Sequence, residues 1–392
     1  MKNGNKKRIA LVVGTRPEVV KMAPVYRAIS ESTSLSPVLI STGQHRQMLD
    51  QAFAVFGLKP DIDFNLMQPG QGLPELTARV MTHMSQALQS IGPAAVLLQG
   101  DTTTVLASAL AAFYQRIPIG HVEAGLRTYD YAAPWPEEMN RRLTDPISRW
   151  CFAPTDWSAN NLLAEHVPAE RVHVTGNTVV DALFWVRERS QGHSMNAEEL
   201  SERCQIPAAF CSMYLRQGGV RRRWVLITGH RRESFGDGFE NICRAITELS
   251  ERYPDIGLLY PVHMNPNVQE PVRRILGGNP RVALIPPVTY ADFIWLMERC
   301  DFVLSDSGGV QEEAPSLGKP VLVMRETTER PEGVRAGTCV LVGTDPNCII
   351  GECARLLDDP GEYRRRSQLA NPYGDGRASI KIRTLLEADL TR

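Results

Sequence analysis

Short apolar runs alternate along the chain with segments in which apolar residues recur at helical spacing. Apolar runs of this length, without polar alternation, are typical of parallel strands that are buried on both faces. The alternation predicts a parallel sheet with helices packed on it. In the first half of the chain we expect strands at 9–13, 37–42, 94–99, 117–122, 150–154 and 172–175.

The same alternation begins again after a polar stretch. Residues 188–222 show no clean periodicity and end in two glycines and three arginines, which indicates an inter-domain segment. We therefore predict an α/β protein with two Rossmann-like, doubly wound domains, at 1–185 and 186–376, that face each other across a cleft. In the second domain we expect strands at 224–228, 257–261, 282–285, 302–304, 320–324 and 339–342.

Length and composition agree with this organisation and argue against several classes of protein. A chain of 392 residues is too long for one ordinary domain. The formal net charge of -1 argues against nucleic-acid binding. No apolar run approaches the length of a membrane span, and the run at 9–13 is too short for a signal peptide. The eight cysteines lack metal or redox spacing, so we expect free, mostly buried thiols in a reducing cytoplasm.

The segment 303–314 carries the clearest candidate chemistry. An apolar run leads into Gly308 and Gly309, and a helical pattern follows. Glycines leave backbone N–H groups uncovered and a helix N-terminus adds positive potential, so the turn from Ser307 to Gly309 suits a phosphate. Glu313 comes about one helical turn later, where a carboxylate can accept hydrogen bonds from ribose hydroxyls. The alternative is an ordinary strand-to-helix turn.

Two further sets of polar residues lie where strands are predicted to end, and ligands of open α/β sheets bind at that edge. For single residues a structural role stays open, such as Asp101 as the cap of the next helix. Neither a dinucleotide-binding nor an ATP-binding glycine motif follows the first strand, so together the sets favour a nucleotide-sugar pocket. The cationic set, which suits a diphosphate, is Arg16, Lys21, His230 and Arg330. The carboxylate set, which has no metal-ligand motif nearby, is Asp101, Glu123 and Glu137.

Ten short motifs follow one another along most of the chain: Gly14-Thr-Arg-Pro-Glu18, Thr42-Gly-Gln-His45, Gln99-Gly-Asp-Thr102, His121-Val-Glu-Ala-Gly-Leu-Arg-Thr128, Pro134-Trp-Pro-Glu-Glu138 with Asn140-Arg141, Thr175-Gly-Asn-Thr178, Thr228-Gly-His-Arg-Arg-Glu233, Pro261-Val-His263, Asp306-Ser-Gly-Gly309 with Gln311-Glu-Glu313, and Thr328-Glu-Arg-Pro-Glu332. In this order they resemble the bacterial non-hydrolysing UDP-N-acetylglucosamine 2-epimerases. The resemblance implies the two-domain fold of GT-B glycosyltransferases, with a C-terminal helix at 377–392 that packs back on the first domain. It also implies a homodimer, UDP-GlcNAc and UDP-ManNAc as ligands, and neither an added cofactor nor a metal.

The resemblance further implies a mechanism. In this family C2 loses its proton as the C1–O bond to UDP breaks, and UDP returns as a proton reaches the opposite face of C2, which supplies ManNAc units for cell-surface polysaccharide. Inversion needs a group on each face, so the resemblance assigns the acid/base roles to Asp101, Glu123 and Glu137. One of them must be protonated and should have a raised pKa. The resemblance places His230 at the diphosphate and Phe293 by the uracil.

Some family members are activated by UDP-GlcNAc at a second site next to the first. The residues at the matching positions are Gln44, Gln47, Arg79 and His263. Three other readings stay open from the sequence: a GT-B glycosyltransferase, a hydrolysing epimerase that releases ManNAc and UDP, and a nucleotide-sugar sensor without activity.

Overall fold

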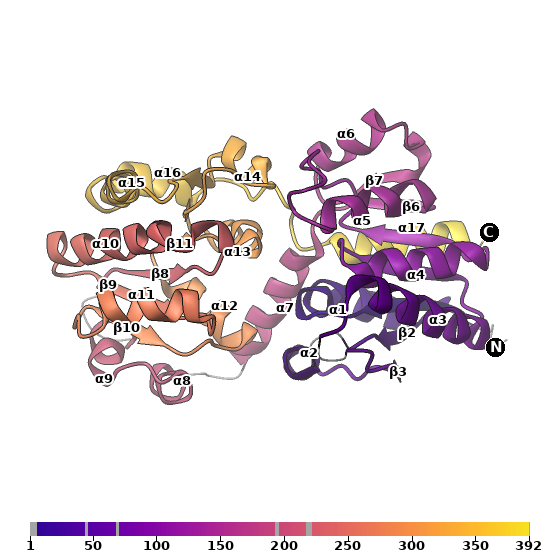
Figure 1. Ribbon diagram of the computed structural model, residues 1–392, viewed down its shortest axis with the longest axis horizontal. Coiled ribbons are helices and arrows are strands. Elements are labelled where there is room, and N and C mark those ends of the chain that lie inside the picture. The colour runs from indigo at the N-terminus through magenta and orange to yellow at the C-terminus, as the bar shows by residue number, and fades with distance from the viewer. Residues whose placement is uncertain (1–5, 44–45, 68–69, 193–195, 217–221, 392) are drawn as a thin grey trace. The chain divides into compact units, whose positions relative to one another are not determined.

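The computed structural model describes residues 6–43, 46–67, 70–192, 196–216 and 222–391. The chain divides into two compact units. Unit 1 comprises Met1–Trp185 and Tyr373–Arg392, and unit 2 comprises Val186–Pro372. Each unit contains its own parallel sheet interleaved with helices (Figure 1), which confirms the predicted α/β class with two Rossmann-like domains. The chain returns to unit 1 at Tyr373, earlier than the expected boundary at 377.

The sheet of unit 1 has seven strands in the order β3-β2-β1-β4-β5-β6-β7. Its paired strands are all parallel, so their carboxyl ends lie at one edge. The chain order reverses at β1, which pairs with both β2 and β4, and such a reversal is where open α/β sheets bind ligands. The strands are β1 (Lys7–Val13), β2 (Leu35–Ser41), β3 (Ile62–Asp63), β4 (Ala95–Gln99), β5 (Ile119–Val122), β6 (Trp150–Ala153) and β7 (Val172–Val174).

The helices of unit 1 begin and end at residues that favour helix termini. Thr102 caps one helix by accepting a hydrogen bond from the backbone N–H of Val105, and Gly92 ends another with φ of 55°. The helices are α1 (Arg16–Ser30), α2 (Arg46–Phe56), α3 (Leu73–Ile91), α4 (Thr103–Tyr114), α5 (Glu137–Thr144), η1 (Asp145–Ile147), α6 (Asp156–Ala164), η2 (Ala169–Arg171), α7 (Thr178–Gly192) and α17 (Ala378–Leu390). Of these, α7 carries the chain into unit 2.

Unit 2 has a six-stranded parallel sheet in the order β10-β9-β8-β11-β12-β13. Its strands are β8 (Trp224–Thr228), β9 (Gly257–Pro261), β10 (Val282–Ile285), β11 (Phe302–Ser305), β12 (Val321–Val323) and β13 (Cys339–Leu341). Its helices are α8 (Ala197–Cys204), α9 (Ala208–Phe210), η3 (Cys211–Leu215), η4 (Arg232–Ser234), α10 (Asp237–Arg252), α11 (Pro266–Leu276), α12 (Tyr290–Arg299), α13 (Gly308–Glu313), η5 (Ala314–Leu317), α14 (Pro331–Ala336), α15 (Pro346–Asp358) and α16 (Pro360–Ser367).

Each unit has its own apolar core, built from the strands predicted by the apolar runs. In unit 1, Ala10, Val12, Val96 and Leu98 pack with residues of α3 and α4. In unit 2, strand residues pack with the apolar faces of α10, α11 and α15. Strands covered by helices on both faces bury nearly all of their apolar side chains. This burial stabilises the sheet by about 25 cal/mol per Å² of apolar surface removed from water.

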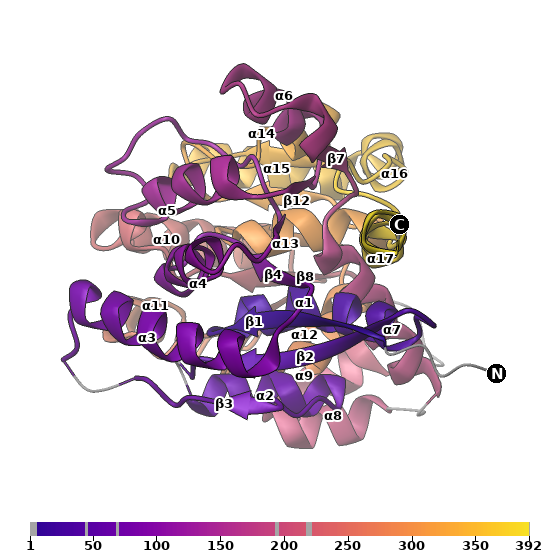
Figure 2. The same ribbon diagram turned by 90° about the vertical axis from the view of Figure 1, so that its right-hand side faces the viewer.

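The C-terminal helix α17 completes unit 1. It packs against α1; in Figure 1 it is the yellow helix that lies among the purple and magenta elements of this unit, and Figure 2 shows it end-on. Its first turn is capped from a distant part of the sequence, because buried Asp181 on α7 accepts hydrogen bonds from the backbone N–H groups of Ala378 and Ser379 and from the Ser379 hydroxyl. A carboxylate at a helix N-terminus is favourable, so Asp181 fixes α17 to α7.

The segment 188–222, which we expected to be irregular, contains helices in its described part. In α8 the buried Leu200 and Cys204 are four residues apart, and in α9 Phe210 is buried. An added Cβ at Gly257 would lie 2.8 Å from Phe210, so this segment packs closely on the start of β9. The polar residues around these apolar positions hid a helical pattern.

Three further expectations concern the cysteines, metal binding and membrane-spanning helices. Seven of the eight cysteines are buried free thiols, and Cys348 is exposed. Among the residues that the structure describes, no group of three histidine, cysteine, aspartate or glutamate residues is arranged to hold a metal ion. In the same ranges, no helix combines the length and the apolar character needed to cross a membrane.

Candidate functional site

Asp101 lies just beyond the end of β4. Its carboxylate Oδ2 is 2.5 Å from Arg141 Nη2, and its backbone oxygen accepts a hydrogen bond of 2.8 Å from Asn140 Nδ2. Thr102, not Asp101, caps α4, so the alternative of Asp101 as a helix cap is wrong. The cause is a turn at Gly100, with φ of 83°, which directs the chain away from the strand one residue before Asp101. The carboxylate is therefore held by α5.

Glu123 follows β5 and is buried. Its carboxylate accepts hydrogen bonds from Lys21 Nζ, from Gln99 Nε2 and, at 3.3 Å, from Asn177 Nδ2. These donors come from α1, from β4 and from the loop before α7, so three elements of unit 1 fix one carboxylate. Lys21 was predicted to contact a diphosphate, and here it forms a buried ion pair with Glu123.

Glu137 is the first residue of α5, where a carboxylate is favoured by the helix dipole. The same helix carries Asn140 and Arg141 one turn later, and these two contact Asp101. The neighbouring strands β4 and β5 end at Gln99 and Val122, which are opposite one another in the register. The structure thus places Asp101, Glu123 and Glu137 on elements that meet at one edge of the sheet.

A fourth carboxyl group, Glu18, was not among the predicted residues. It lies in the first turn of α1 and accepts hydrogen bonds from the backbone N–H groups of Gly14 and Thr15 and from Thr102 Oγ1, the last at 2.6 Å. Burial raises the pKa of Glu18 to about 7, although its hydrogen bonds lower it, and the nearby charge of Asp101 raises it further. The sequence signal was the spacing of Thr15 and Glu18, which form a capping box. Arg16, in the same turn, is exposed.

In unit 2 the loop after β8 is tied to the turn after β11. Buried Asp306 accepts hydrogen bonds from the backbone N–H groups of His230 and Arg231, at 2.7 and 2.8 Å. The His230 ring Nδ1 is 3.3 Å from the other carboxylate oxygen. The ring stacks on that of His263, with 5.3 Å between centroids. The structure therefore brings together two histidines that the sequence assigned to neighbouring sites.

The guanidinium of Arg330 lies against the glycine turn. An added Cβ at Gly308 would lie 2.5 Å from the Arg330 guanidinium, so any larger residue here would displace this guanidinium. Arg330 donates hydrogen bonds of 2.7 Å to Glu312 and to Glu329, and it lies over the start of α13. Burial alone would raise the pKa of Glu329, but Arg330, Arg325 and Arg231 hold it well below its ordinary value.

The predicted ribose carboxylate, Glu313, ends α13 and is buried. Tyr290 of α12 donates a hydrogen bond of 2.7 Å to its Oε1. Phe293, expected by the uracil, lies one turn further along the same helix and is half-buried. The start of α13 is therefore bordered by Arg330, and its end by Tyr290.

The residues predicted for a second site are described only in part. Arg79 lies on α3, and its Nη1 is buried without a hydrogen bond among the described residues. Gln44 lies outside the described residues. Gln47 lies within α2, and its side chain is outside what the structure describes.

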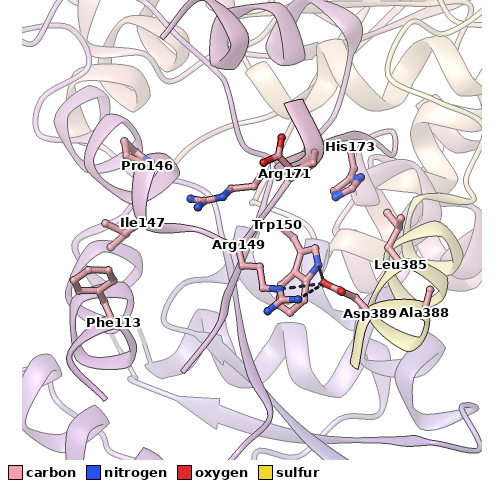
Figure 3. A pocket seen from close by; sticks show the side chains of 11 residues that line it. Phe113, Pro146, Ile147, Arg149, Trp150, Arg171, His173, Leu385, Ala388 and Asp389 are labelled. Carbon is pink, nitrogen blue, oxygen red and sulfur yellow. Dashed lines mark hydrogen bonds and ion pairs between the residues drawn. The ribbon is translucent and has the colours of Figure 1, made fainter. Parts of the chain in front are cut away.

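A cavity of about 710 Å³ lies elsewhere in unit 1, between β6, η2 and α17 (Figure 3). Arg149 and Trp150 reach across it to Asp389, to which both donate hydrogen bonds. Its lining includes none of the predicted site residues, so this cavity does not coincide with the carboxylates.

Comparison with known proteins identifies the family. The profile of the UDP-N-acetylglucosamine 2-epimerases matches residues 27–387. The chain belongs to the UDP-N-acetylglucosamine 2-epimerase family. A relative of that name from Salmonella typhimurium (strain LT2) is 51% identical over 381 residues, which cover 97% of this chain and 98% of the relative. The resemblance seen in the sequence is thereby confirmed, and the chain is that of an enzyme.

Solved structures of the epimerase family agree with the fold. The Neisseria meningitidis UDP-GlcNAc 2-epimerase bound to UDP-GlcNAc is similar with a TM-score of 0.88 and 46% identity, over 97% of this chain and 100% of that one. An S. aureus structure with UDP has a TM-score of 0.86 and 41% identity, over 98% and 97% of the two chains.

Proposed function

We propose that this protein interconverts UDP-N-acetylglucosamine and UDP-N-acetylmannosamine at C2, without hydrolysing either sugar nucleotide. The observation that carries the proposal is the pair of separately held carboxylates in unit 1. Glu123 receives hydrogen bonds from Lys21 and Gln99, and Asp101 pairs with Arg141 on α5. Inversion of a carbon requires one group to remove a proton from one face and another to deliver it to the opposite face.

The chemistry explains why two carboxylates alone are insufficient. The hydrogen at C2 is a weak acid, because the adjacent carbon carries no carbonyl group. If the C1–O bond to UDP breaks as C2 loses its proton, the electron pair of the C2–H bond forms the C1=C2 double bond and UDP leaves as an anion. UDP then re-adds at C1 while a proton bonds to the opposite face of C2. The leaving diphosphate must therefore be stabilised and retained.

Unit 2 supplies groups that suit this role. His230 is fixed by Asp306, and the guanidinium of Arg330 lies over Gly308 at the start of α13. A backbone N–H pair and a nearby cation are the usual means of holding a diphosphate. Glu313, oriented by Tyr290, suits the ribose hydroxyls.

The test is proton NMR of the purified protein with UDP-GlcNAc in deuterium oxide, without added NAD. We expect both UDP-sugars to appear with deuterium at C2. Free ManNAc with UDP would replace this proposal by the hydrolysing reaction. UDP release only when an acceptor sugar is added would favour a glycosyltransferase, and an unchanged substrate would favour a sensor.

The two faces of C2 can be assigned with variants. Asp101→Asn, Glu123→Gln and Glu137→Gln are compared for deuterium exchange, starting from each sugar separately. A variant that has lost the base for one face blocks exchange from one epimer, while elimination from the other epimer still releases UDP and 2-acetamidoglucal. A variant that slows both directions equally has lost a group that serves both.

We further propose that the enzyme works as a homodimer through the end of α4 and the outer face of α5. These two helices pack together and expose large apolar side chains: Phe113 is 50%, Tyr114 67% and Leu143 52% exposed. A monomer gains nothing from such a patch, whereas a second copy would cover it. Light scattering should give twice the chain mass for the native protein and a monomer for the double variant Phe113→Asp, Leu143→Asp. A native monomer would contradict this proposal.

Two expectations of the sequence remain part of the proposal. The buried free cysteines and the UDP-sugar substrates suit the cytoplasm, where the product would feed cell-surface polysaccharide synthesis.

Activation by UDP-GlcNAc through Arg79 and His263 predicts a lag when UDP-ManNAc is the sole substrate. A hyperbolic dependence of rate on UDP-ManNAc without a lag would contradict this activation.

A further inference from the structure

A buried cluster of charges lies directly beneath the carboxylate edge of unit 1. His121 of β5 is fully buried, and its two ring nitrogens have different partners. Nδ1 is 2.6 Å from Asp145 Oδ1, and Nε2 is 2.7 Å from the backbone oxygen of Gly100. Gly100 is the residue before Asp101, so this imidazole contacts the backbone that carries a proposed acid/base group.

The partners determine which atoms carry protons. A backbone carbonyl can only accept a hydrogen bond, so Nε2 must be protonated. Asp145 also receives hydrogen bonds at Oδ2, from Arg127 Nη2 at 2.7 Å and from the Gly125 N–H at 3.3 Å, and the guanidinium charge stabilises its ionised form, in which Oδ1 can only accept. Nδ1 must then be protonated too, and His121 is an imidazolium.

The electrostatic balance of the cluster supports this assignment. Burial by itself lowers the pKa of His121, but the charge of Asp145 and the two hydrogen bonds raise it above its ordinary value. Burial raises the pKa of Asp145, whereas His121 and Arg127 lower it below its ordinary value. Arg127 is also paired with Glu165, and the Cys151 thiol near the Asp145 backbone is neutral, because burial raises its pKa. The cluster is thus a buried set of paired charges.

We propose that His121 is a positioning residue, whose Nε2–H holds the Gly100 carbonyl and so fixes Asp101 against Arg141. The backbone oxygen of Asp101 is held separately by Asn140, so the two donors fix consecutive carbonyl groups. Gly100 has φ of 83°, and such a turn has little stiffness of its own. Removal of the His121 donor would let the Gly100 peptide rotate and carry the Asp101 carboxylate out of place. This inference rests on the proposed function, because it takes Asp101 as a reacting group.

Two substitutions separate positioning from general stability. In His121→Gln the side-chain amide nitrogen lies near the position of Nε2 and can still donate to Gly100. In His121→Asn it lies near Nδ1, donates to Asp145 and leaves the Gly100 oxygen without its donor. Both variants lose the charge and part of the volume of the ring, so each is the control of the other.

The expected result is a difference in kcat that stability does not share. We expect kcat of His121→Asn to fall about 100-fold and that of His121→Gln less than about fivefold, with KM within about threefold in both. The melting temperatures of the two variants should be similar. Equal kcat values, or a greater loss in the glutamine variant, would overturn the proposal.

Two measurements do not depend on activity. In the native protein, ¹⁵N NMR of labelled histidine should show both nitrogens of His121 protonated at neutral pH, and one unprotonated nitrogen would overturn the assignment even if neither variant folds. Hydrogen exchange at the Asp101 amide should accelerate in the asparagine variant alone. If the native protein shows no epimerase activity but the NMR and hydrogen-exchange results are both as expected, the proposed function is rejected and the positioning role is kept. If the native protein is active but neither result is observed, the proposed function is kept and the positioning role is rejected.

Discussion

The two charged regions of this molecule hold their side chains in different ways. In unit 1, Glu123 is buried and receives hydrogen bonds from three elements, and the side chains of His121, Asp145 and Arg127 are fully buried. In unit 2, the His230 side chain is 41% exposed, and Asp306 holds it chiefly through the backbone of its loop. Removing one partner of a buried ion pair leaves an unpaired charge, which costs a large free energy of folding. An exposed imidazole ring, by contrast, can exchange one hydrogen-bond partner for another. Under the proposed mechanism, the fixed carboxylates of unit 1 suit proton transfer, and the more exposed groups of unit 2 suit a leaving group that returns.

The largest effect should come from removing a carboxylate of unit 1. We expect Glu123→Gln to lower kcat about 1000-fold, because general acid–base groups contribute about 10²–10⁴ to rate. UDP affinity, measured by calorimetry, should stay within about twofold of the native value, since the proposal places most of the nucleotide contacts in unit 2. An equal loss in kcat and in UDP affinity would show that the two regions do not divide the work in this way.

Glu18 gives the next largest effect, on stability rather than rate. Its pKa is about 7 in the folded protein and 4.5 ordinarily, so between these values the folded state retains a proton that the unfolded state has lost. The free energy of unfolding should therefore fall by about 3 kcal/mol from this group as pH rises from about 4.5 to about 7. Glu18→Gln removes this contribution, and urea titrations at pH 5 and 8 measure it. The same pH slope in native and variant protein would contradict it.

A smaller effect should follow loss of the cap on α17. Asp181→Ala removes three hydrogen bonds to the first turn of this helix, and we expect about 2 kcal/mol less stability in unit 1. The control is Asp375→Ala, since Asp375 is exposed and bonds only the nearby Arg377 N–H among the described residues. Thermal unfolding of both variants tests this, and equal losses would mean that the cap itself contributes little.

The smallest effect should come from removing the tyrosine hydroxyl that orients Glu313 in unit 2. Tyr290→Phe removes the hydrogen bond to Glu313, and we expect UDP to bind about fivefold more weakly, in line with about 1 kcal/mol for one hydrogen bond. Tyr363→Phe is the matched control, because it removes a tyrosine hydrogen bond to the backbone of Asp301 instead. Calorimetry with UDP should show a change in the first variant alone.

Much of the fold could be predicted because apolar runs mark the strands of a doubly covered sheet. Helices with polar sequences were harder: α8 buries Leu200 and Cys204, but its exposed residues mask their four-residue spacing. The two-residue edge strand β3, Ile62–Asp63, is too short to give any periodic signal. Local pattern therefore predicts elements that bury a continuous apolar face, and it misses those that bury two or three side chains.

The candidate site shows the same limit. Strand ends indicated Asp101 and Glu123, because a carboxylate after a buried run is a local signal. Their partners Arg141 and Lys21 are 40 and 102 residues away, and nothing in the sequence spacing pairs them. The spacing gives His121 no role, since only the structure shows that both of its ring nitrogens meet acceptors. Contacts distant in sequence are what the pattern cannot supply.

The bond between Asp181 and the start of α17 also affects the order in which the protein is made. The residues that complete unit 1, Tyr373–Arg392, are translated after the whole of unit 2. Asp181 therefore waits for partners 197 and 198 positions later, while Val186–Pro372 already has its full sequence. Domains generally fold in the order of synthesis, but here the domain that starts first finishes last. A tag or truncation at the C-terminus would accordingly disturb the domain that contains the first strand.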